Sequence, residues 1–134
     1  MECQWVLADI PNFPFHYANF LYRNDSCTKL LTINAQYFVN PLREEGGGDV
    51  IIVTTVFEHL NNPLFISGYL LERLNAGGLL VFDFIKSEGH GLDHPNAVAE
   101  REEYLNNILE QVKIIKGNVS DISKSISRCI GVKK

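Results

Sequence analysis

The chain has 134 residues, of which 46% are hydrophobic and 21% are charged, and its formal net charge is −4. This length suits one domain, which we predict over residues 1–134, and the composition is ordinary for a globular protein. The apolar runs are too short to span a bilayer, no basic segment precedes the first of them, and Lys and Arg do not cluster beyond Lys133–Lys134. We therefore expect a cytoplasmic protein without a membrane or nucleic-acid partner.

The N-terminal part predicts a strand, a helix and a second strand. Trp5 to Ala8 is a short apolar strand that ends at Asp9, and Asn12 is a suitable N-cap for a helix over Phe13 to Tyr22. A turn then leads to a strand over Lys29 to Asn34. We expect the aromatic side chains of the helix to pack against a sheet. They are Phe13, Phe15, Tyr17 and Phe20.

The clearest pattern lies between Asp49 and Phe84. Val50 to Val53 is an uninterrupted apolar run, typical of a strand buried on both faces. A helix is predicted next, with Asn62 as its N-cap and Gly77-Gly78 at its end, and Leu79 to Phe82 forms a second buried strand. Strand, helix and strand at this spacing make a βαβ unit with a parallel pair of strands. Ligands bind beyond the carboxyl ends of such strands.

The βαβ unit is followed by a polar loop, a helix and a hairpin. The loop, Lys86 to Asn96, contains two Gly, one Pro and two His, and loops of this length are more often functional than structural. A helix with an apolar stripe is predicted from Asn96 to about Val112. Lys113 to Lys116 either ends this helix or begins a strand, and the alternation from Ile126 to Val132 predicts a strand. The nearness of the two segments suggests an antiparallel hairpin at the edge of the sheet.

Two segments with histidines lie beyond the predicted strand ends. Glu58 and His59 form the turn before the capped helix, and His59 is a candidate general base because histidine exchanges protons near neutral pH. A structural role, in which His59 orients the turn, is the alternative. His90 and His94 lie in a Gly/Pro loop, where their spacing does not place them on one face. We therefore predict that this loop faces a substrate and that the chain has no metal site.

The ordered set of elements resembles the class I S-adenosylmethionine-dependent methyltransferases. The stretch DVIIVTTVFEHLNNP…LLERLNAGGLLVFDF is similar to that family's fourth and fifth strands. Asp49, Glu58-His59-Leu60 and Gly77-Gly78 stand where the family has an acidic residue, a Glu-His-Leu-type turn and a Gly-Gly turn. WVLADIP and LTINA resemble the second and third strands, and ISRCIGVKK resembles the antiparallel last strand. The resemblance implies a Rossmann-like α/β three-layer sandwich, with a mostly parallel sheet and an antiparallel C-terminal hairpin.

The resemblance also implies S-adenosyl-L-methionine as the cofactor. Asp9 matches the acidic residue that binds the ribose hydroxyls, although a loop carboxylate that caps the next helix is the alternative. Asn34 and Ala35 match the loop beside the adenine, where a plain strand end is the alternative. The positions implied for cofactor binding are Asp9, Ile10, Asn34, Ala35 and Thr54; those for the substrate are Thr55, His90 and His94; and the catalytic candidates are His59 and Glu58.

One part of the family pattern has no counterpart in this sequence. The family's Glu/Asp-x-Gly-x-Gly fingerprint ends the first strand and cradles the cofactor by close backbone approach, which needs glycine. Here the clustered glycines are Gly46-Gly47-Gly48, which precede a strand instead of following one.

We therefore predict a sheet that lacks the family's first strand and helix, about 25–35 residues, and that leaves the outer edge of the Val50–Val53 strand without its usual neighbour. Leaving that edge unpaired in a dry interior would be costly. The flanking strands can close on each other, a second copy or a partner chain can cover the gap, or the sequence can be part of a longer protein.

Three functions are compatible with these patterns. The first is a methyltransferase, or the larger part of one, that acts on a small-molecule or sugar-like acceptor. The second is a methyltransferase-like module that assembles or scaffolds proteins without binding the cofactor. The third is a nicotinamide-dependent Rossmann enzyme, whose Gly-x-Gly-x-x-Gly turn is also missing. The antiparallel last strand favours the methyltransferase lineage over the third.

Overall fold

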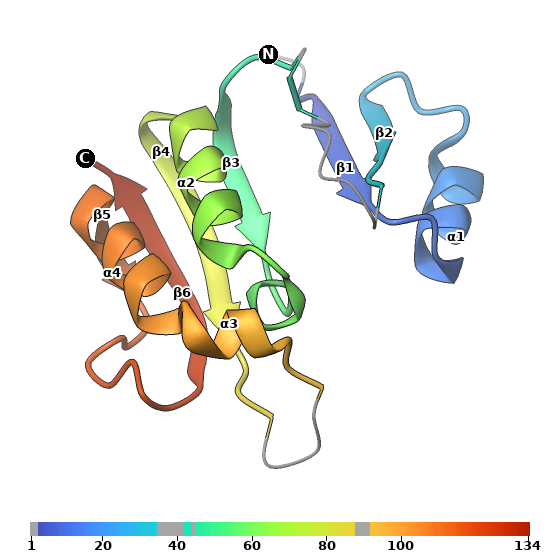
Figure 1. Ribbon diagram of the computed structural model, residues 1–134. Helices are drawn as coiled ribbons and strands as arrows, with labels where there is room; N and C mark the ends of the chain where they lie inside the picture. The colour runs from blue at the N-terminus through green and yellow to red at the C-terminus, as the bar shows by residue number, and fades with distance from the viewer. Residues whose placement is uncertain (1–2, 35–41, 44, 88–91) are drawn as a thin grey trace. The chain divides into compact units, whose positions relative to one another are not determined.

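The computed structural model describes residues 3–34, 42–43, 45–87 and 92–134, which form two compact units, Met1–Gly46 and Gly47–Lys134. Each unit contains a sheet of its own (Figure 1). The first sheet has two strands, and the second has four strands in the order β3-β4-β6-β5. The prediction of one domain over residues 1–134 stays a prediction.

The first unit is the predicted strand, helix and strand. Strand β1 (Trp5–Asp9) and strand β2 (Thr28–Thr32) are parallel, and helix α1 (Phe13–Tyr22) connects them. The side chain of Asn12 accepts a hydrogen bond of 2.8 Å from the backbone N–H of Phe15, which confirms the predicted N-cap.

The aromatic side chains of α1 are mostly exposed, which corrects the prediction that they all pack against a sheet. Phe15 is buried at 8% exposure, whereas Phe13, Tyr17 and Phe20 are 81%, 55% and 60% exposed. Phe13 and Tyr17 stack on each other with ring centroids 6.5 Å apart. The physical reason is the width of the sheet, because two strands offer too narrow a face to cover a whole aromatic helix.

The second unit is built on a βαβ unit and an antiparallel hairpin (Figure 1). Strands β3 and β4 are parallel, and β6 runs antiparallel to both β4 and β5, as the sequence predicted for the hairpin. The elements are β3 (Gly48–Val53), the 3₁₀ helix η1 (Phe57–His59), α2 (Pro63–Arg73), β4 (Leu74–Phe84), α3 (Pro95–Ala99), α4 (Arg101–Gln111), β5 (Val112–Lys116) and β6 (Ile126–Lys133).

Both ends of α2 differ from the prediction. The side chain of Asn62 makes no capping hydrogen bond, because its backbone (φ −138°, ψ 60°) departs from the extended conformation usual for an N-cap. The helix ends at Arg73, and Gly77-Gly78 lie inside β4. A Cβ on Gly78 would lie 3.0 Å from the carbonyl oxygen of Asp49, so this glycine permits close approach of β4 to β3 and does not cap a helix.

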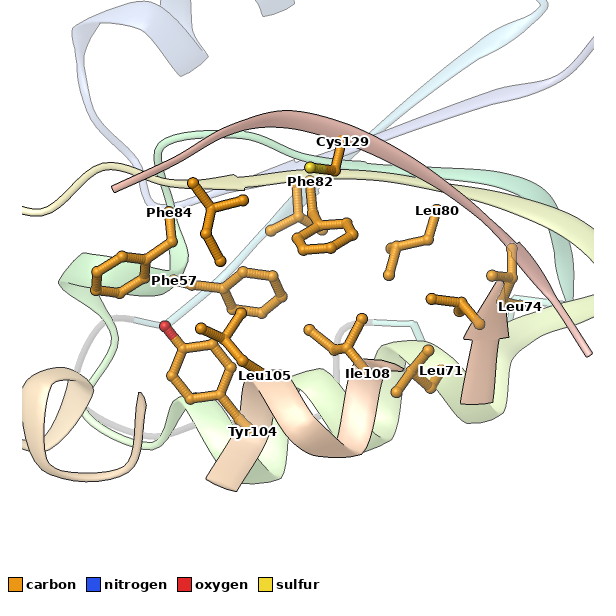
Figure 2. Close-up of a cluster of buried hydrophobic side chains, with 13 residues drawn as sticks. Phe57, Leu71, Leu74, Leu80, Phe82, Phe84, Tyr104, Leu105, Ile108 and Cys129 are labelled. Carbon is orange, nitrogen blue, oxygen red and sulfur yellow. The ribbon is translucent and has the colours of Figure 1, made fainter. Parts of the chain in front are cut away.

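The helix predicted from Asn96 is two helices, because the chain turns at Glu100 (φ −88°, ψ −1°) between α3 and α4. Helix α4 packs with α2 over the sheet. Figure 2 shows the side chains of Leu80 and Phe82 from β4 directed toward Leu105 and Ile108 of α4. This cluster is the hydrophobic core of the second unit. It also includes Phe57, Leu71, Leu74, Phe84, Tyr104 and Cys129.

The opposite face of the four-stranded sheet is apolar and partly open to solvent. Val50 and Ile52 of β3 are 47% and 58% exposed. The strand register places them beside Leu79 and Val81 of β4, and next to these lie Ile130 and Val132 of β6. Among the described residues, β3 pairs with β4 and with no other strand, so it is an edge strand. No helix in the described part of the chain is long and apolar enough to cross a membrane.

Candidate functional site

The carboxyl ends of β3 and β4 meet at one edge of the second sheet, because the two strands are parallel. Thr54 follows β3, and the next residue, Thr55, has a positive φ of 56°. The backbone N–H of Thr55 donates a hydrogen bond of 2.6 Å to the Asp83 carboxylate at the end of β4, which is 5% exposed. A β-branched residue rarely adopts positive φ, and such strained positions concentrate at functional sites.

Glu58 lies inside the unit, in η1. Its side chain is 1% exposed, and neither carboxylate oxygen has a hydrogen-bond partner among the described residues. Desolvation by burial is the largest cause and raises the pKa of Glu58. A backbone N–H and the nearby His59 act in the opposite direction, and the carboxylates of Asp83 and Asp93 add smaller upward effects. Burial therefore makes ionisation of Glu58 less favourable, whereas the neighbouring His59 is exposed.

One ring nitrogen of His59, Nδ1, is hydrogen-bonded, which leaves Nε2 as the nitrogen that can accept a proton. Its Nδ1 lies 3.0 Å from the carbonyl oxygen of Leu92. A carbonyl can only accept a hydrogen bond, so Nδ1 carries the hydrogen, and Nε2 of the neutral ring holds the lone pair. This arrangement suits the predicted general base, and it also satisfies the structural alternative, because the bond ties η1 to the loop before α3.

The residues just before α3 are hydrogen-bonded to η1 and to Ser87, which follows β4. The backbone N–H of His94 donates to the carbonyl oxygen of Glu58 at 2.8 Å, and that of Ser87 donates to Asp93 at 3.0 Å. His94 caps α3, since its Nδ1 accepts a hydrogen bond of 3.2 Å from the N–H of Asn96. His90 lies outside the described residues. Within the described part, no three His, Cys, Asp or Glu side chains are placed to hold a metal ion.

The cofactor positions fall in two units. In the first unit, Asp9 ends β1 opposite Thr32, and its backbone carbonyl accepts a hydrogen bond of 2.8 Å from the N–H of Ile33. The structure thus brings Asp9, Ile10 and Asn34 to the carboxyl edge of β1 and β2. Ala35 lies outside the described residues, and Thr54 belongs to the second unit.

Sequence reasoning missed a polar group beside the core of the second unit. Arg101 is 8% exposed, stacks over the ring of Phe84 at 4.2 Å, and donates a hydrogen bond of 3.2 Å to the carbonyl oxygen of Ser123. It lines a cavity of about 480 Å³ with Asp93 and Asp121. A single arginine in the acidic first turn of a helix gives no sequence signal of burial, because only the fold brings the 117–125 loop to it.

No protein-family model matches the sequence, and no curated protein matches it. Among solved structures, the chain is similar to the N-methyltransferase NodS from Bradyrhizobium japonicum WM9 in complex with S-adenosyl-L-homocysteine, with 12% identity, a TM-score of 0.67, and coverage of 97% of this chain and 66% of that chain. It is also similar to TehB from Haemophilus influenzae (17% identity, TM-score 0.64, 98% and 50% coverage). A methyltransferase from Pyrococcus furiosus has 21% identity, a TM-score of 0.53, and 98% and 63% coverage.

These similarities confirm the fold predicted from the sequence. The chain has the Rossmann-like α/β fold of S-adenosylmethionine-dependent methyltransferases, with the strand order and antiparallel hairpin described above. The chain spans 66% of the NodS chain and 50% of the TehB chain.

Proposed function

We propose that this chain is an S-adenosylmethionine-dependent methyltransferase, or the larger part of one, that acts on a small-molecule or sugar-like acceptor in the cytoplasm. The observation that carries the proposal is the shared fold, which matches NodS over 97% of this chain at a TM-score of 0.67. The strained Thr55 and the exposed His59, both at the carboxyl end of β3, support it.

The first unit offers one group that fits the cofactor. Asp9 is exposed at the end of β1, where its carboxylate accepts hydrogen bonds from the N–H of Ile10 at 2.7 Å and from Asn12 at 3.4 Å. An ionised carboxylate has about four acceptor sites, so two ribose hydroxyls can still donate to it. The fit is partial, because the sequence contains no Glu/Asp-x-Gly-x-Gly turn after a strand.

Methyl transfer requires few catalytic side chains from the protein. The bound cofactor supplies an activated methyl group on a sulfonium, so alignment and the exclusion of water provide most of the rate. In this proposal, Thr54 and Thr55 position the reactants at the end of β3. Where the acceptor carries a proton that must leave, His59 Nε2 accepts it. His94 and the loop around it border the acceptor.

The edge of β3 that does not pair with β4 is a candidate binding surface for a partner. We include in the proposal that a second copy of this chain or another chain covers this edge, because unpaired backbone groups beside an apolar face favour association.

Isothermal titration of the full chain with S-adenosyl-L-homocysteine tests the methyltransferase proposal. We expect saturable binding, and we expect Asp9→Asn to weaken it by roughly tenfold, because the amide offers fewer acceptor sites to the ribose. The amide oxygen can still accept from the N–H of Ile10, so the loop should keep its shape. The matched control is Glu103→Gln, an exposed acid on α4.

The absence of heat at millimolar ligand would reject cofactor binding. That result would favour the alternative function, a methyltransferase-like module that scaffolds or oligomerises, for which the missing glycine turn is the specific evidence.

A further inference from the structure

The turn after β3 has an unusual backbone conformation. The parallel pairing of β3 with β4 ends at Val53 and Phe82, and Thr55 lies just beyond it with a φ of 56°. Among the residues that the structure describes, Thr55 is the only one other than glycine with a positive φ. A β-branched side chain disfavours this left-handed conformation, so another contact must hold the turn in place.

The contact that holds the turn comes from the side chain of Asp83. The N–H of Thr55 lies beyond the last backbone pair, and it donates a hydrogen bond of 2.6 Å to Asp83 Oδ1. The neighbouring side chains, Phe82 and Phe84, point into the core (Figure 2), and Asp83 itself is 5% exposed. A hydrogen bond to an ionised carboxylate is roughly twice as strong as one to a neutral acceptor, and shielding from water strengthens it. The bond therefore offsets the strain at Thr55.

The segments on both sides of this turn are fixed without the help of Asp83. Val53, the last residue of β3, and Phe57, the first residue of η1, are both buried in the core. Within η1, the carbonyl oxygen of Glu58 accepts a hydrogen bond from the N–H of His94. Residues 54–56 are therefore the part of the chain whose path the Asp83 bond can decide.

The path of this turn sets where its side chains point. Thr54 is half-buried and Thr55 is exposed, and both lie at the carboxyl edge of β3, where open parallel sheets bind ligands. Without the bond to Asp83, Thr55 would relax toward the extended backbone that β-branched residues favour. Because the ends of the turn are fixed, that relaxation would redirect both threonine side chains.

From this geometry we propose that Asp83 is a positioning residue, which acts through the N–H of Thr55 to fix the turn that presents Thr54 and Thr55 to a ligand. The ligand-binding role of the two threonines rests on the proposed function. A carboxylate with a purely structural role would instead change the stability of the whole second unit, and Thr55→Gly would not repair its loss.

Hydrogen exchange in the full chain, followed by NMR, tests the contact itself. We expect Asp83→Ala to speed exchange of the Thr55 amide by about tenfold or more, because the released N–H is open to water. The amides of Ile51 and Phe82, within the β3–β4 pairing, should keep their protection, which would show that the change is local. The matched control is Asp49→Ala, which removes an exposed carboxylate at the other end of β3 and should leave the Thr55 amide unchanged.

Two further variants separate the hydrogen bond from the strain. Asp83→Asn keeps an oxygen that can accept from the N–H of Thr55, so exchange of this amide should lie between the native rate and that of Asp83→Ala. Glycine adopts positive φ without steric cost, so Thr55→Gly should let the turn form without the carboxylate. The methyl resonances of Thr54 and Val56 should therefore move in Asp83→Ala, and in Asp83→Ala/Thr55→Gly they should match those of Thr55→Gly alone.

Titration with S-adenosyl-L-homocysteine gives the functional measurement. We expect Asp83→Ala to weaken binding by roughly tenfold, about 1.4 kcal/mol, and Asp49→Ala to bind as the native chain does. The double variant Asp83→Ala/Thr55→Gly should regain most of the lost affinity, because Thr54 is again presented. If the native chain gives no heat, the proposed function is rejected, whereas the exchange and methyl measurements, which need no cofactor, still decide whether Asp83 holds the turn.

The positioning role of Asp83 is overturned if the Thr55 amide exchanges at the same rate in the native chain and in Asp83→Ala. It is also overturned if Asp83→Ala removes protection throughout β3 and β4, or if Thr55→Gly fails to restore the methyl resonances in the double variant. Saturable binding of S-adenosyl-L-homocysteine that is equally tight in the native chain and in Asp83→Ala would overturn it as well.

Discussion

Glu58 is an ionisable residue in an environment that disfavours its charge. The carboxyl group is buried in η1 without a hydrogen-bond partner among the described residues, and burial raises its pKa above the ordinary value of 4.5. As pH rises above 4.5, the unfolded chain ionises freely at this residue, whereas the folded chain resists ionisation. The folded state therefore binds more protons, and Glu58 lowers stability as pH rises from 4.5 through its raised pKa.

We expect Glu58→Gln to remove this loss. Gln has no proton to release, so the variant does not lose stability in this way. The difference in unfolding free energy between the variant and the native chain should grow in favour of the variant as pH rises from 4.5 through the raised pKa of Glu58, and it should be constant below pH 4.5. Urea denaturation at a series of pH values from below 4.5 to neutral measures the difference. The control Glu110→Gln, at an exposed position of α4, should show no such trend, and a parallel trend in both variants would contradict the account.

At the scale of elements, the sequence predicted correctly those strands and helix starts whose residue pattern is compatible with one kind of structure. The β-branched run Val50 to Val53 indicated the position of β3, and Asn12 indicated the start of α1. The predicted burial of β3 on both faces is wrong, because Val50 and Ile52 are 47% and 58% exposed on the face that α2 and α4 do not cover. Gly77-Gly78 were misplaced because glycine serves both helix ends and close strand contacts. In the site, sequence indicated Thr55 but not its strain, which depends on a contact with Asp83, 28 residues away, that only the sheet register creates.

Close packing between β5 and β6 gives a prediction at this scale. A Cβ on Gly131 would lie 2.7 Å from Cγ2 of the buried Val112, so Gly131→Ala should push β5 from β6 and cost about 1–3 kcal/mol. Gly68→Ala in α2 is the matched control, because its Cβ meets its nearest neighbour, Asn107, at an ordinary 3.8 Å. That control should gain about 0.5–1 kcal/mol from helix propensity. Urea denaturation measures the change in unfolding free energy for each variant. The packing argument would be refuted if Gly131→Ala and Gly68→Ala changed the unfolding free energy in the same direction.

At the scale of the whole molecule, the hydrophobic core belongs to one unit. The core cluster runs from Val53 to Cys129, whereas Phe15 is the one buried hydrophobic side chain among the described residues of Met1–Gly46. The cysteines Cys3 and Cys27 of the first unit are free, so no disulfide replaces the missing core. Chains of this size with little core rarely fold alone.

This distribution predicts that Gly47–Lys134 folds without the first unit. The fragment should unfold cooperatively in urea, with a midpoint close to that of the full chain, whereas Met1–Gly46 alone should give the circular dichroism of an unfolded peptide. A clear fall in the midpoint of Gly47–Lys134 would show that the first unit stabilises the second. The fragment lacks Asp9, so under the proposed function it should stay folded yet fail to bind S-adenosyl-L-homocysteine. Full binding by the fragment would instead place the cofactor contacts within residues 47–134 and remove Asp9 from the proposal.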